Sequence, residues 1–160
     1  MARLRPTSSE ELCEIVADAA ARRATLGIVG GGSKSAIGAP RDCETLDMTA
    51  FAGVIDYAPA ELVLVAGAGA PLAEIETLVA GEGQMLAFEP FDPAPLFGEQ
   101  PGRATIGGAV AAGLGGSRRL SAGGVRDHLL GFAAVSGRGE AIVGGARVVK
   151  IRGSGVALYD

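Results

Sequence analysis

Aromatic residues, cysteines and histidines are scarce in this chain of 160 residues. Only 4% of the residues are aromatic and tryptophan is absent, so Ala, Val, Leu and Ile have to form the core. The two cysteines, Cys13 and Cys43, lack metal-site spacing, and we expect free thiols and no bound metal. Because the sequence shows no carboxylate pair and no nucleophile–base arrangement, it indicates no catalytic residue.

Long apolar runs and an excess of basic residues are also missing. The longest uncharged apolar stretch, residues 62–73, is shorter than the ~20 residues that cross a bilayer. The N-terminal residues lack the apolar region of a secretory signal. The net charge of −4 disfavours nucleic acid as a partner, because basic faces bind phosphate backbones. We therefore expect a cytoplasmic protein without a transmembrane segment.

Apolar residues are plentiful, and their spacing predicts a mixture of helices and strands. They make up 48% of the chain, against 20% charged residues, which excludes a largely disordered state. Apolar positions recur at helical spacing from Leu12 to Ala20, behind a capping box in which Thr7 is the N-cap and Glu10 its partner. We predict further helices over 71–80 and 106–112, and strands over 26–29, 45–48, 54–57, 62–66, 85–87, 132–135 and 141–143. This order of helices and strands along the chain is typical of an α+β fold.

Glycine is the most unusual feature, with 26 residues, about twice the average usage. Gly30, Gly31, Gly32, Ser33 and Lys34, here called the glycine loop, directly follow the strand predicted over 26–29. Consecutive glycines allow backbone N–H groups to converge on one anion, and pyrophosphate suits such a loop. The loop matches neither the P-loop nor the Rossmann fingerprint. A flexible surface turn is the alternative interpretation.

A second glycine-rich segment predicts an unusual helix. Thr105 is placed to cap a helix that starts with Ile106, Gly107 and Gly108 and consists almost entirely of small residues. Such a helix packs weakly by itself, and a flat ligand such as a flavin or an ADP group would fit against it. Its N-terminus would favour phosphate. Close packing between a helix and a strand is the alternative.

Four motifs occur in an order that resembles a known family. They are the glycine loop, the run from Thr105 to Arg119, the run from Val125 to Gly131 and the run from Gly145 to Lys150. Together they resemble the p-cresol methylhydroxylase type of FAD-binding domain, and within that group the FAD-binding subunits of bacterial glycolate oxidases. The resemblance extends over residues 1–150.

This resemblance implies the fold, the cofactor and the site. Two α+β subdomains, residues 1–60 and 61–160, would hold non-covalent FAD between them. The glycine loop would bind the pyrophosphate, Thr105 to Gly108 would lie along the flavin and ribityl chain, and Asp127 would lock a nearby turn by hydrogen bonds. Further cofactor contacts are implied for Gly113, Gly116 and Ser117.

The resemblance also implies an assembly, and the chain departs from the family after Lys150. Family members act with a second flavoprotein subunit and an iron–sulfur subunit, and oxidise a 2-hydroxy acid by hydride transfer to the flavin. The residues after Lys150 differ from the family pattern, so we expect a truncated domain without a substrate domain. The tail from Lys150 onward also has little pattern of its own. The alternative function is a non-catalytic remnant of the FAD-binding fold that serves as an interaction module or has lost flavin binding. Self-association is the alternative to the partner subunits.

Three basic residues have two interpretations each. Arg118 and Arg119 could bind a phosphate, a substrate carboxylate or a partner subunit. Alternatively they form a solvated pair on the surface. His128, the single histidine, suits either a flavin link or catalytic base, or else a partly exposed turn. We favour the turn, because no partner for the imidazole is evident.

Overall fold

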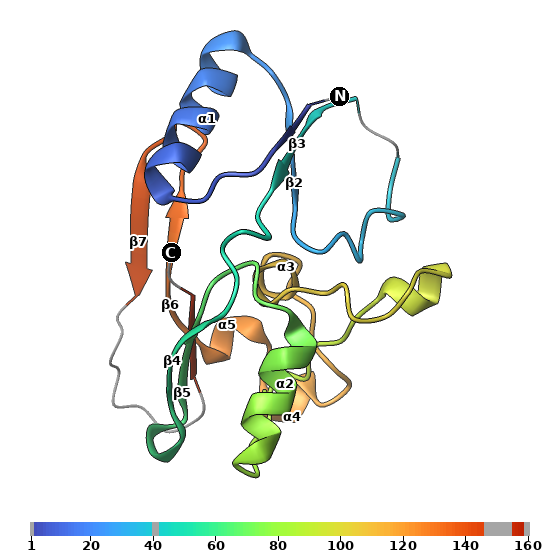
Figure 1. The fold of residues 1–160 in the computed structure, drawn as a ribbon. Helices are drawn as coiled ribbons and strands as arrows, with labels where there is room; N and C mark the ends of the chain where they lie inside the picture. Colours follow the sequence, from blue (N-terminus) through green and yellow to red (C-terminus); the bar gives the residue numbers. More distant parts are fainter. Residues whose placement is uncertain (1, 40–41, 146–154, 159–160) are drawn as a thin grey trace.

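The computed structural model describes residues 2–39, 42–145 and 155–158. It is an α+β arrangement with two separate sheets. Figure 1 shows the N-terminal helix and the smaller sheet at one end of the molecule and the remaining helices at the other. No described helix has both the length and the apolar character needed to cross a membrane.

The first helix, α1 (Ser9–Arg22), begins one residue later than the capping box predicts. Ser8, and not Thr7, is the N-cap, and its hydroxyl accepts a hydrogen bond from the amide of Glu11 at 3.2 Å. The Glu11 carboxylate accepts from the amide of Thr7 at 2.8 Å. The predicted pair Thr7–Glu10 is therefore wrong by one position, because serine and threonine are both good caps and two hydroxyls stand side by side.

The smaller sheet is parallel and has the order β1-β3-β2, from β1 (Arg3–Leu4), β2 (Leu26–Val29) and β3 (Glu44–Asp47). Both outer strands pair with β3, with Leu4 and Ile28 opposite Leu46. Strands β2 and β3 confirm two of the predicted strands to within one residue. The glycine loop leaves this sheet at the carboxyl end of β2.

The larger sheet has the order β4-β5-β8-β6-β7. Its strands are β4 (Val54–Ala58), β5 (Val63–Ala66), β6 (Leu129–Val135), β7 (Ala141–Gly145) and β8 (Gly155–Leu158). Strand β8 lies in the middle and pairs in parallel with both β5 and β6. Residues 155–158 thus form a strand, although the tail from Lys150 onward has little pattern in its sequence.

Helices cover the larger sheet around one apolar core. The core joins β5 to α2 (Leu72–Gly81) and α3 (Ile106–Ala111), with Ile75 and Ile106 fully buried. Leu78, predicted on the inner face of α2, is 39% exposed. The predicted strand at 85–87 is wrong, because this segment is irregular and Leu86 and Phe88 enter the core from it. The remaining helices are η1 (Pro59–Glu61), η2 (Ala94–Phe97), α4 (Arg119–Ala122) and α5 (Val125–His128).

The change from one sheet to the other falls between Asp47, the end of β3, and Val54, the start of β4. Helix α1 also reaches the larger sheet, because Gly139 in the turn between β6 and β7 lies against Cys13 and Ala17. The division into subdomains 1–60 and 61–160 stays a prediction.

Candidate functional site

The glycine loop and the segment before α3 lie against each other, although about 70 residues separate them in the sequence. A β carbon on Gly30 would overlap the hydroxyl oxygen of Thr105, and one on Gly31 would overlap the carbonyl oxygen of Arg103. Only glycine allows two chain segments to approach so closely. The two segments that carry the sequence prediction are therefore brought together.

The glycine loop presents unused backbone donors. The amides of Gly31, Gly32, Ser33 and Lys34 donate to no backbone carbonyl within the described ranges. Gly32 has a φ of 76°, a left-handed conformation that favours glycine, and its carbonyl accepts from both the amide and the hydroxyl of Ser35, at 3.1 and 2.7 Å. Successive free amides in a turned backbone are the geometry of an anion-binding nest.

Lys34 adds a cation at the same place. A β carbon on Gly108 would lie 3.5 Å from the Lys34 ammonium, which places that group beside the first turn of α3. Burial lowers the pKa of Lys34, and the negative charge of Asp92 acts in the opposite direction. Across the described part of the chain, no carboxylate forms an ion pair with it. A half-buried ammonium that no described carboxylate contacts directly suits an anionic ligand.

The first amides of α3 are already used by the protein. Ile106 donates to the carbonyl of Ala70 at 3.0 Å, and Gly107 donates to the carbonyl of Ala68 at 2.9 Å. The amide of Gly108 donates to the Thr105 hydroxyl at 3.3 Å, as predicted for a Thr105 cap. The expectation that the N-terminus of this helix favours phosphate is therefore corrected, because these three donors face Ala68, Ala70 and Thr105.

An open cavity of about 700 Å³ lies at the other end of α3. Val110 and Gly113 line it from the helix side, and Phe132 lines it from β6. Its other lining residues are Val125, Arg126, Leu129, Leu130, Gly131, Gly144 and Gly145. The volume is within the range of small-molecule sites. Helix α3 thus joins the cationic glycine loop at its start to a largely apolar cavity at its end.

The other predicted site residues are distributed unevenly around this cavity. Gly113 lines it, whereas Gly116 and Ser117 do not. Gly116 lies instead against Glu89, and its amide donates to the carbonyl of Phe88 at 3.0 Å. The Asp127 carboxylate accepts a hydrogen bond from the amide of Gly124 at 2.8 Å, which confirms that it locks its turn.

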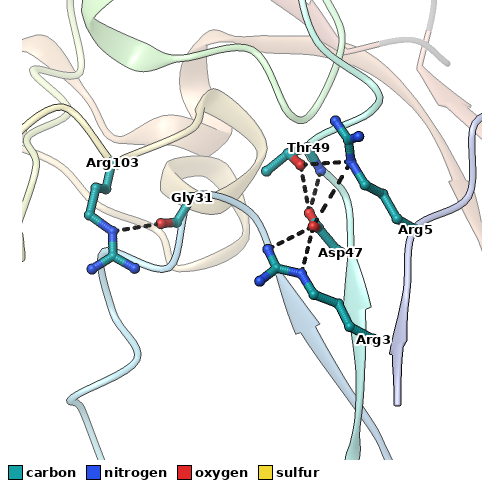
Figure 2. Close-up of polar contacts among 6 residues, drawn as sticks. All are labelled: Arg3, Arg5, Gly31, Asp47, Thr49 and Arg103. Carbon is teal, nitrogen blue, oxygen red and sulfur yellow. Dashed lines mark hydrogen bonds and ion pairs between the residues drawn. The ribbon is translucent and has the colours of Figure 1, made fainter.

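Asp47, which is buried, forms an ionic cluster with two exposed arginines that the sequence analysis missed. Its carboxylate is 2.7 Å from Arg3 and 4.0 Å from Arg5, and it accepts from the hydroxyl and amide of Thr49 at 2.7 and 2.9 Å. Burial by itself would raise the pKa of Asp47, but these donors hold that pKa below its ordinary value. Figure 2 shows the cluster beside Gly31, at the carboxyl end of the smaller sheet.

Arg103 was also missed, since a single arginine in an irregular segment carries no periodic signal. Its Nε donates to the carbonyl of Gly31 at 3.0 Å, and its guanidinium pairs with Glu99 at 2.6 Å. The main-chain amide of Arg103 donates to Asp92, which also accepts from the amides of Ala94 and Gly102. Arg103 thus bonds the segment that contains Asp92 and Glu99 to the glycine loop.

The ambiguous basic residues now have defined surroundings. Arg118 forms an ion pair with Glu89 at 2.7 Å, and its hydrogen bonds hold the pKa of Glu89 below its ordinary range. Arg119 packs against Gly124. His128 Nε2 lies 2.7 Å from the carbonyl of Ala122, and the imidazole lies 6.0 Å from the Phe88 ring between centroids. These contacts favour the turn interpretation of His128.

Comparison with known families and curated proteins gives two findings. A model described as FAD binding domain matches residues 2–145. Glycolate oxidase subunit GlcE of Escherichia coli (strain K12) is 41% identical over 152 residues, which cover 95% of this chain and 40% of that protein. The chain therefore spans two fifths of the length of this curated relative.

Solved structures with the same arrangement include several oxidases. 6-hydroxy-D-nicotine oxidase from Arthrobacter nicotinovorans has a TM-score of 0.66 at 16% identity, over 89% of this chain and 29% of that one. A variant of BBE-like 1 from Physcomitrella patens has a TM-score of 0.67 at 22% identity, over 89% of this chain and 29% of that one. At such low identity these likenesses show a common fold and nothing more.

Proposed function

The chain belongs to the FAD binding domain family, and we propose that it holds FAD non-covalently as the FAD-binding component of a glycolate oxidase-like flavoprotein. The match to the FAD binding domain family spans nearly all of the described chain. It confirms FAD, the cofactor predicted from the sequence. The solved structures confirm the predicted p-cresol methylhydroxylase-type α+β fold. The convergence of the glycine loop with residues 103–108 is the observation that carries the proposal.

The residues at this convergence suit the diphosphate of FAD. Unused amides of the glycine loop would donate to the phosphate oxygens, and the Lys34 ammonium would supply the charge. We propose Gly30, Gly31, Gly32, Ser33 and Lys34 as the diphosphate-binding set. Because the first amides of α3 are engaged elsewhere, Thr105 to Gly108 would contribute a flat surface of small residues and not donors.

The cavity at the end of α3 suits a ring system of the cofactor. Its lining includes aliphatic side chains and the bare backbone of Gly113 and Gly145, which allow a planar group to approach closely. When bound, FAD supplies a two-electron acceptor for the oxidation of a substrate such as a 2-hydroxy acid. The residues of this chain would bind the cofactor, orient it and exclude water from one of its faces.

Substrate and assembly lie beyond this binding role. The curated relative is much longer than this chain, so we propose that turnover requires protein outside residues 1–160. A second flavoprotein subunit and an iron–sulfur subunit would be the partners, with self-association as the alternative. We also propose that subdomains 1–60 and 61–160 enclose FAD between them, with Gly116, Ser117 and Asp127 near the cofactor.

A flavin titration tests the proposal. The purified chain should bind one FAD, seen as quenched flavin fluorescence and a shifted visible spectrum. Replacing Gly31 with Ala should abolish binding, because a β carbon there overlaps the Arg103 carbonyl. Gly137→Ala is the matched control, since no atom lies within 4 Å of its β carbon. A folded wild-type chain that leaves FAD unchanged would contradict the proposal and favour the interaction-module alternative.

A further inference from the structure

Arg103 contacts the glycine loop at two independent points. Its main-chain carbonyl lies against the α carbon of Gly31, and its Nε donates to the carbonyl of the same residue at 3.0 Å. One of its terminal nitrogens lies beside Gly32, 2.8 Å from the position of a β carbon there. Figure 2 shows the guanidinium reaching across to the Gly31 carbonyl. Arg103 therefore contacts Gly31 through both its main-chain carbonyl and its guanidinium.

Arg103 is itself held in place by two carboxylates. A terminal nitrogen donates to Glu99 at 2.6 Å, and the main-chain amide donates to Asp92 at 3.1 Å. Asp92 also accepts from the amide of Gly102 at 2.8 Å. One carboxylate therefore fixes the two consecutive backbone amides of Gly102 and Arg103. The guanidinium is thus neutralised by Glu99 and used to bond backbone, which leaves it a poor candidate for a free phosphate ligand.

Holding the Gly31 carbonyl also fixes the amide that follows it. The peptide group is planar and trans, so the Gly32 N–H points opposite to the Gly31 carbonyl. When Arg103 draws that carbonyl to one side, the Gly32 N–H is directed to the other. The next peptide is fixed in the same way, because Ser35 donates twice to the Gly32 carbonyl and so orients the Ser33 N–H. Both amides are among the unused donors of the loop.

We propose that Arg103 is a positioning residue for the diphosphate of FAD, aiming the Gly32 amide at the ligand by holding the Gly31 carbonyl. This inference rests on the proposed FAD-binding function. Lysine cannot replace Arg103, because one ammonium cannot reach the Gly31 carbonyl and Glu99 in the geometry of a planar guanidinium. Preorganised donors bind more tightly than donors that must be ordered on binding.

Two measurements on the whole chain separate the positioning role from the function it serves. The first is the ¹⁵N order parameter of the Gly32 amide without flavin. It should fall from about 0.85, typical of rigid backbone, to below about 0.6 in Arg103→Gln. The second is the FAD dissociation constant, which should rise about tenfold in Arg103→Gln and nearly as much in Arg103→Lys. Arg138→Gln, an exposed arginine in the turn after β6, should change neither value.

Glu99→Gln distinguishes positioning from direct phosphate binding and removes only an exposed ion pair, so the chain should stay folded. Positioning predicts weaker FAD binding, by about twofold to fivefold, because Arg103 loses a support. Tighter binding would show that a freed guanidinium meets the phosphate, and would overturn the inference.

Unchanged order parameters and FAD affinity in Arg103→Gln would also overturn it. A wild-type chain that binds no FAD would refute the proposed function and the role of Arg103 in diphosphate binding. The order parameter of the Gly32 amide would still show whether Arg103 holds the glycine loop.

Discussion

Gly107 faces the backbone of Ala68, and its amide donates to the Ala68 carbonyl at 2.9 Å. A β carbon on Gly107 would lie 2.6 Å from that carbonyl oxygen and 2.9 Å from the Ala68 α carbon. This contact fixes α3 against the segment that follows β5. Since α3 links the glycine loop to the cavity, the position of the whole candidate site depends on it.

Gly107→Ala should therefore destabilise the protein despite the better helix propensity of alanine. The clash is with main-chain atoms that cannot rotate away, and overpacking of this kind costs about 1–3 kcal/mol. Gly81→Ala, at the end of α2, is the matched control because its β carbon would meet nothing within 4 Å. Urea denaturation of both variants checks this. A Gly107→Ala protein as stable as Gly81→Ala would contradict the packing of α3.

Asp47→Asn should destabilise the chain by about 1–3 kcal/mol, because it removes the charge that Arg3 and Thr49 bind. The pKa of Asp47 is depressed in the folded state, so its stabilising effect is present above 3.8, its ordinary value, and is lost as the pH falls further. The difference between the variant and wild type should shrink below that pH in denaturation curves. Asp18→Asn, in an exposed pair with Arg22, should match wild type throughout.

Lys34→Gln should weaken FAD binding about tenfold near neutral pH, because a charge-assisted contact to phosphate is lost. Bound diphosphate favours the ammonium form, so wild-type affinity should fall as the pH rises through the lowered pKa of Lys34. The ratio of the two dissociation constants should approach one at high pH. Flavin ionisation affects both proteins equally and cancels in that ratio. A pH-independent ratio would show that the Lys34 charge plays no part.

Ala157→Pro should prevent stable folding, because residue 157 lies in β8 between β5 and β6, opposite Val65 and Gly131. Proline removes a backbone donor and is excluded from central strands. Ala157→Ser keeps the amide and should melt within a few degrees of wild type. Circular dichroism melting curves check both variants. A well-folded Ala157→Pro protein would place the tail outside the sheet.

Elements with a local signal were predictable from the sequence, whereas those that depend on distant partners were not. The strand 26–29 is a short apolar run that ends at three glycines, and the helix after Thr105 carries its own cap. Strand β8 has no such signal, since it is defined by pairing with β5 and β6. The strand predicted at 85–87 fails for the converse reason, because Leu86 has an apolar neighbourhood but pairs with no strand in the described ranges.

The candidate site shows the same division. The glycine loop was visible in the sequence because three consecutive glycines directly follow a predicted strand. Its neighbours Arg103 and Asp92 were not, because their contacts span up to 72 residues or are made to backbone atoms. Sequence reasoning also took the first amides of α3 as free, although Ala68 and Ala70 accept two of them.

The central claim is that unused amides of the glycine loop bind the diphosphate of FAD. Amide chemical shifts of the ¹⁵N-labelled chain, recorded during titration with FAD, ADP and riboflavin, test it most directly. FAD and ADP should both shift the amide signals of Gly31, Gly32, Ser33 and Lys34, whereas riboflavin, which lacks phosphate, should leave them in place. FAD binding that moves other signals and leaves these four unchanged would contradict the account.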